Sequence, residues 1–81
     1  MHNIFGVIIM CQRIKDFRED KDLTQTEMGG ILEMSQTGYS KYETGENDIQ
    51  TGILIKLAAY HKTSIDYMLG LTETKESYPK K

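Results

Sequence analysis

Two glutamines that each follow a hydroxyl residue are the side chains best placed to do chemistry in this sequence. Gln25 follows Thr24, and Gln36 follows Ser35. Threonine and serine are favoured helix N-caps, and Glu27, three residues after Thr24, completes the pattern of a capping box. Each glutamine therefore takes the first position of a short helix, where its side chain projects past the helix end. An amide in that place donates and accepts hydrogen bonds at once, as pairing with the edge of an adenine requires.

The second glutamine opens a polar helix face. Thr37, Ser40 and Lys41 are expected to point outward from this helix, and no acidic residue lies between Gln36 and Tyr42. Short polar side chains and helix N-terminal amides hold phosphates, while amide and ammonium groups read base edges. The pattern predicts a helix-turn-helix whose second helix enters the major groove of duplex DNA.

Hydrophobic periodicity predicts an all-α fold of five helices around one core. We expect them at about Met10 to Lys21, Thr24 to Glu33, Gln36 to Thr44 and Thr51 to Lys62, with a short fifth helix between a Ser64 cap and Gly70. Gly45 is expected to end the third helix in the left-handed conformation. The inward faces are predicted at Met10, Ile14 and Phe17; at Leu23; at Met28, Gly29 and Leu32; at Tyr39 and Tyr42; at Leu54, Leu57, Ala58 and His61; and at Ile65, Met68 and Leu69.

The chain divides into three segments. Residues 1–9 form an apolar N-terminal extension, residues 10–70 the DNA-binding domain, and residues 71–81 a polar, frayed tail. The extension is too apolar to stand free in water. We expect it to pair with a second copy, as a strand or an extended helix, or to cover an exposed edge of the core.

Bulk properties narrow the class of protein. Eighty-one residues, 38% of them hydrophobic, suffice for one small core, and no run approaches the ~18 apolar residues of a membrane span. The start lacks the basic leader and cleavage site of a signal peptide. Cys11 is the only cysteine, so no internal disulfide forms, and a cytoplasmic location is expected. The two histidines lack a ligand constellation, so we expect no metal, no cofactor and no enzymatic activity.

Charge argues mildly against a nucleic-acid partner, because the net charge is −2 and the pI is about 5.6. The acids, however, crowd outside the predicted recognition helix, at Asp16, Glu19, Asp20, Asp22, Glu46 and Asp48. The electrostatic field at the DNA-binding face matters more than the net charge of the whole chain. Few phosphate-neutralising cations are present, so we expect modest affinity per monomer and a homodimer.

A set of short motifs in fixed order makes the sequence resemble a known family. The motifs are Arg13-Ile14-Lys15 with Arg18-Glu19, Leu23-Thr24-Gln25, Ser35-Gln36-Thr37, the run from Ser40 to Gly45, and the run from Ser64 to Gly70. From about Gln12 to Gly70 the chain resembles the phage-repressor and Cro type of helix-turn-helix domain, the XRE family. The resemblance implies a five-helix, lambda-repressor-like bundle that binds operator DNA as a two-fold dimer and regulates transcription in bacteria or phages, as a repressor.

The resemblance also implies roles for seven residues that would meet DNA. Gln25 would contact a phosphate and brace the next glutamine, and Gln36 and Thr37 would contact bases. Lys41 would reach a guanine edge or a phosphate, and Ser40 a phosphate or a base. Thr44 and Asn47 would touch the backbone at the neighbouring groove wall.

A second implied feature is a buried or half-buried ion pair between Arg18 and Glu43, which would fix the tilt of the recognition helix.

The sequence departs from the family pattern at the turn between the second and third helices. Glu33 stands where the family usually has glycine. That position often needs positive φ, so we expect either a strained glutamate or a different turn geometry.

The expected function is sequence-specific DNA binding, with two recognition helices about 34 Å apart on a palindromic site. Two other interpretations stay open. One is an antitoxin that binds DNA and masks a toxin, with the apolar extension facing the toxin. The other is a protein-interaction module that has kept the fold and lost DNA binding.

Overall fold

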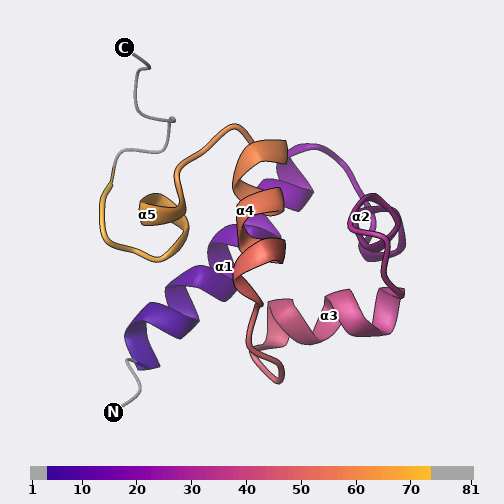
Figure 1. Cartoon of the computed structure of the whole chain (residues 1–81), viewed down its shortest axis with the longest axis horizontal. Helices are drawn as coiled ribbons and strands as arrows, with labels where there is room; N and C mark the ends of the chain where they lie inside the picture. Colours follow the sequence, from indigo (N-terminus) through magenta and orange to yellow (C-terminus); the bar gives the residue numbers. More distant parts are fainter. Residues whose placement is uncertain (1–3, 74–81) are drawn as a thin grey trace.

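The computed structural model describes residues 4–73, and five helices make up most of this part of the chain (Figure 1). They are α1 (Ile4–Asp20), α2 (Gln25–Ile31), α3 (Gln36–Thr44), α4 (Thr51–Tyr60) and α5 (Ile65–Met68). The predicted all-α, five-helix class is confirmed. No helix in the described part is long and apolar enough to cross a membrane. Residues 74–81 of the predicted tail lie outside the described residues.

The start of the first helix was predicted at Met10, and this was wrong. α1 begins at Ile4, so the helix runs through the boundary drawn between residues 9 and 10. The segment is therefore not a strand over its described residues. Ile9 packs against Gly70, where an added Cβ would lie 3.1 Å from Ile9 Cγ2, while Ile8 stays 58% exposed. The apolar segment is thus helical, with Ile9 packed against Gly70 and Ile8 exposed.

Hydroxyl caps begin three of the helices, as predicted. Thr24 Oγ1 accepts from the N–H of Glu27 at 3.0 Å, and Glu27 Oε1 accepts from the N–H of Thr24 at 2.8 Å, which is the capping box. Ser35 Oγ accepts from Gly38 N–H at 3.0 Å. Ser64 caps α5 in the same way. These caps satisfy amide groups that have no partner inside the helix.

One cluster of buried side chains holds the bundle together, and every helix contributes to it. It comprises Ile14, Phe17, Met28, Leu32, Tyr39, Tyr42, Leu57, Ala58 and Met68. All nine lie on the predicted inward faces. Five other residues expected inside are only partly buried: Met10, Leu23, Leu54, Ile65 and Leu69. α2 and α4 each end two residues before the predicted limit, at Ile31 and Tyr60.

Candidate nucleic-acid interface

A tight turn between α2 and α3 sets the direction of the recognition helix. Glu33 has φ +60°, so the turn keeps the left-handed geometry that usually takes a glycine. The N–H of Glu33 donates to Gly30 O at 3.0 Å, and that of Met34 donates to Gly29 O at 2.8 Å. An added Cβ on Gly29 would stand 2.9 Å from Met34 O, so the backbones approach closely here. The alternative of a different turn geometry was wrong, and Glu33 is the strained residue.

The predicted DNA-facing residues belong to α2, α3 and the following loop, and they differ in burial. Gln36 and Thr37 are exposed at the start of α3, and Ser40 and Lys41 are half-buried one turn later. Gln25, at the start of α2, is also half-buried. Thr44 and Asn47 are exposed at the end of α3 and in the loop.

The two helix-opening glutamines bond to each other across the turn. Gln36 Nε2 donates to Gln25 Oε1 at 2.7 Å. Gln25 Nε2 in turn donates to Glu43 Oε1 at 3.1 Å. This chain of hydrogen bonds joins the first turn of α3 to its last turn by way of α2. The bond from Gln25 to Glu43 was not predicted. Gln25 and Glu43 are 18 residues apart in the sequence, and only the packing of α2 against α3 brings their side chains together.

Beneath the glutamines, Arg18 and Glu43 form the ion pair that the resemblance implied. Arg18 Nε lies 2.7 Å from Glu43 Oε2, and Arg18 Nη2 donates to Glu43 Oε1 at 3.2 Å. The two side chains are 11% and 4% exposed, so the pair is largely buried. Arg18 Nη1 also donates to Leu23 O at 2.7 Å. The pair thus ties α1, the corner before α2, and α3 together.

The ion pair shifts both of its ionisable groups toward the charged form. The hydrogen bond to Glu43 raises the pKa of Arg18 above its ordinary value. Burial by itself raises the pKa of Glu43, but the Arg18 guanidinium, the neighbouring Tyr39 hydroxyl and the Gln25 amide together outweigh it and hold that pKa below its usual value. Glu43 is therefore an ionised carboxylate under ordinary conditions.

Tyr39 packs under the same pair and is fully buried. Its ring meets Tyr42 edge-on, with centroids 6.5 Å apart. Its hydroxyl has no hydrogen-bond partner among the described residues. Burial raises the pKa of Tyr39, and the nearby Glu43 carboxylate adds to the shift. Tyr39 thus lies in the core, as predicted.

The end of α3 offers fewer free polar groups than its start. Thr44 Oγ1 donates to Lys41 O at 3.2 Å and lies 3.4 Å from Glu46 Oε1. A carboxylate in that place opposes the approach of a phosphate. The N–H of Asn47 donates to Lys41 O at 3.3 Å, and Gly45 ends the helix with φ +83°. These bonds use the backbone of Lys41 and leave its ammonium outside them.

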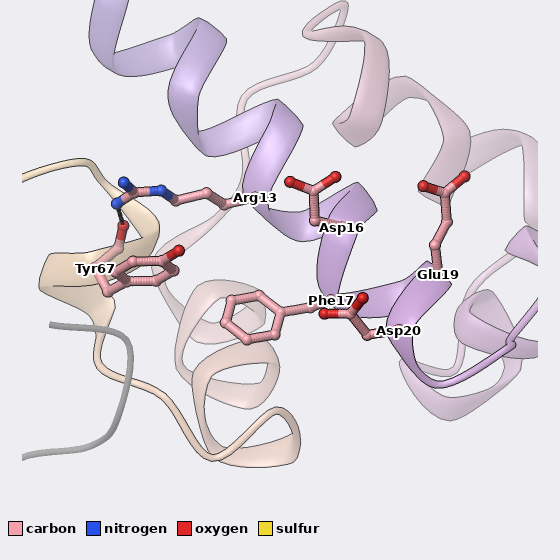
Figure 2. A pocket seen from close by; sticks show the side chains of 6 residues that line it. All are labelled: Arg13, Asp16, Phe17, Glu19, Asp20 and Tyr67. Carbon is pink, nitrogen blue, oxygen red and sulfur yellow. Dashed lines mark hydrogen bonds between the residues drawn. The ribbon is translucent and has the colours of Figure 1, made fainter. Parts of the chain in front are cut away.

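All three acidic residues of α1 lie beside one groove. Asp16, Glu19 and Asp20 line a groove of about 210 Å³ together with Arg13, Phe17 and Tyr67 (Figure 2). None of these six residues belongs to α2 or α3. Arg13 lies 3.8 Å from the ring centroid of Tyr67 and donates to the Tyr67 carbonyl, so it fastens α5 to α1. The groove is thus built by residues of α1 and α5.

The comparisons with known proteins agree with this geometry. The helix-turn-helix family model matches residues 14–68. Over 63 residues the chain is 30% identical to YobD of Bacillus subtilis, an uncharacterized HTH-type transcriptional regulator, covering 78% of this chain and 56% of that protein. Over 62 residues it is 34% identical to the HTH-type transcriptional regulator ImmR of Bacillus subtilis, covering 76% of this chain and 49% of that protein.

The chain thus spans about half the length of the curated relatives it matches. No solved structure matches it significantly. The family match covers the capped helix pair, the turn at Glu33 and the core around Tyr39. The chain therefore belongs to the XRE type of the helix-turn-helix family.

Proposed function

We propose that the protein is a sequence-specific DNA-binding regulator of transcription that inserts α3 into the major groove of its operator. One observation carries this proposal. Gln36 is exposed at the helix start, and its bond to Gln25 uses one of its two amide N–H groups. The other N–H and Oε1 remain for a base. One donor beside one acceptor matches the N7 and N6–H₂ groups of adenine.

Neighbouring residues take the roles that the family implies. Thr37 contacts a second base, and Ser40 and Lys41 contact a base or a phosphate. Gln25 keeps one amide N–H for a phosphate, since its other polar contacts go to Gln36 and Glu43. Thr44 and Asn47 approach the backbone at the groove wall, although Glu46 beside Thr44 opposes a direct phosphate contact by that hydroxyl.

The relatives support regulation in particular, because both carry the description of HTH-type transcriptional regulators. We propose repression, since a protein bound over an operator blocks other proteins from that DNA. A homodimer on a palindromic site would place two α3 helices about 34 Å apart and double the number of contacts. That doubling matters because α3 carries a single cation, Lys41.

The test compares affinity for a site selected from a random duplex pool with affinity for unselected duplex. Gln36→Ala should weaken binding to the selected site by about 5- to 150-fold, the range of one bidentate base contact, and should change binding to unselected duplex little. Gln12→Ala is the matched control, because Gln12 is an exposed glutamine of α1 whose Nε2 donates to Asp16 Oδ1 at 2.8 Å. Equal losses on both DNAs for Gln36→Ala would contradict base reading. Failure to retard any duplex at low salt would favour a protein-interaction module.

A further inference from the structure

The hydrogen-bond chain through the two glutamines runs in one direction, and we propose that Glu43 sets this direction and thereby decides which base Gln36 reads. Glu43 acts here as a positioning residue that does not touch DNA. The inference rests on the proposed function, because it concerns the base that α3 contacts. It goes further by assigning part of the specificity to a carboxylate at the far end of the chain of bonds.

The direction follows from what each group can donate. An ionised carboxylate only accepts hydrogen bonds, whereas a glutamine amide both donates and accepts. Gln25 must therefore turn Nε2 toward Glu43, at 3.1 Å. Its Oε1 then faces Gln36, so Gln36 must turn Nε2 toward it, at 2.7 Å. Each amide orientation is forced by the one before it.

Glu43 itself is held firmly enough to act as the fixed end. Its side chain is 4% exposed, and both of its oxygens accept from Arg18. Arg18 carries donors only and is anchored in turn to Leu23 O at 2.7 Å. The same oxygen that accepts from Arg18 Nη2, Oε1, accepts from Gln25. A donor-only residue thus fixes an acceptor-only residue, which leaves the glutamines a single arrangement.

The consequence appears at the base edge. In the observed direction Gln36 offers Oε1 and one N–H, which fit the donor and acceptor of adenine. In the reverse direction Gln36 Oε1 would accept from Gln25, and both N–H groups of Gln36 would be free. Two donors side by side fit the O6 and N7 acceptors of guanine instead. Reversal of the chain of bonds would therefore change the preferred base from adenine to guanine.

The experiment measures the ratio of affinities for two duplexes that differ at one base pair. Selection from a random duplex pool with the wild-type protein gives the binding site. The base pair of this site at which Gln36→Ala abolishes the base preference is the one that Gln36 contacts. The wild type should prefer adenine over guanine there by about 5- to 150-fold. Glu43→Gln should bring this ratio to about one, because an amide at position 43 donates as well as accepts and so allows both directions.

A second variant keeps the ion pair intact and reverses the direction outright. In Gln25→Lys the ammonium only donates, so it pairs with Glu43 on one side and donates to Gln36 Oε1 on the other. The ratio should then favour guanine. This variant decides the matter if Glu43→Gln does not fold, since Arg18 and Glu43 remain paired in it.

Ile14→Val serves as the control for lost stability, because Ile14 is fully buried and its apolar side chain takes no part in the hydrogen-bond chain. It should lower the melting temperature and leave the adenine preference unchanged. A folded Glu43→Gln protein, or a Gln25→Lys protein, that keeps the wild-type preference for adenine would overturn the inference. A wild-type protein in which Gln36→Ala changes no base preference would instead refute base reading by Gln36, which belongs to the proposed function.

Discussion

His61 stacks on Phe17, with ring centroids 5.0 Å apart and ring planes inclined by 18°. Tyr60 meets the same histidine edge-on at 5.2 Å. His61 is 6% exposed, and neither of its ring nitrogens has a hydrogen-bond partner among the described residues. Burial, with a smaller contribution from the Lys21 ammonium, lowers the pKa of His61 to about 4. The predicted packing role of His61 is thus confirmed, and the imidazole is neutral in the fold.

This environment predicts a loss of stability in mild acid. The unfolded chain takes up a proton on His61 near pH 6.5, whereas the folded protein resists until about pH 4. The unfolded state therefore binds more protons as pH falls through this window, and stability decreases. Between pH 7 and pH 5 the free energy of unfolding should fall by about 2 kcal/mol from this group.

Urea denaturation of the wild type and of His61→Phe at both pH values checks this prediction. The variant keeps an aromatic ring for Phe17 and Tyr60 and has no titrating group, so its loss between pH 7 and pH 5 should be smaller by about 2 kcal/mol. The lowered pKa of Glu43 means that the contribution of its ion pair is lost only in stronger acid, outside this pH range. An identical pH dependence in both proteins would contradict the role assigned to His61.

The adjacent glycines of α2 should respond oppositely to alanine. An added Cβ on Gly30 meets nothing within 4 Å, so Gly30→Ala should stabilise the protein by up to about 1 kcal/mol through helix propensity. An added Cβ on Gly29 would stand 2.9 Å from Met34 O in the backbone of the turn. Gly29→Ala should therefore destabilise by about 1–3 kcal/mol despite the same propensity gain. Thermal unfolding of the two variants separates packing from propensity, and a shift in the same direction for both would refute the close approach.

Local signals predicted most of the fold because they act within a few residues. The hydroxyl caps at Thr24 and Ser35 and the stop at Gly45 each depend on a backbone geometry that the neighbouring sequence dictates. The beginning of α1 was missed because tertiary contacts decide it. The segment before Met10 continues the helix where Ile9 finds Gly70, a residue 61 positions further along the chain.

The candidate site shows the same division. The outward positions of Gln36 and Thr37 follow from their place at a capped helix start. At Glu33 the residue type allowed either a left-handed turn or a different turn geometry. The structure shows the left-handed turn, with φ +60°. The bond from Gln25 to Glu43 depends on the angle at which α2 crosses α3, and no local pattern encodes that angle.

Lys41 should govern the salt dependence of DNA binding. It is the single cation of α3, and the bonds from Thr44 and Asn47 go to its backbone carbonyl, so a side-chain change leaves the helix end intact. A lysine that neutralises one phosphate releases about one counterion, which contributes about 0.9 to the slope of log affinity against log salt. Lys41→Gln should lower that slope by about this amount and weaken both selected and unselected duplex. Lys62→Gln, just beyond the end of α4, is the control and should leave the slope unchanged. The contrary outcome is that Lys41→Gln weakens only the selected site and keeps the full salt slope. Lys41 would then contact a guanine edge and not a phosphate, because a base contact alone does not change the number of released counterions.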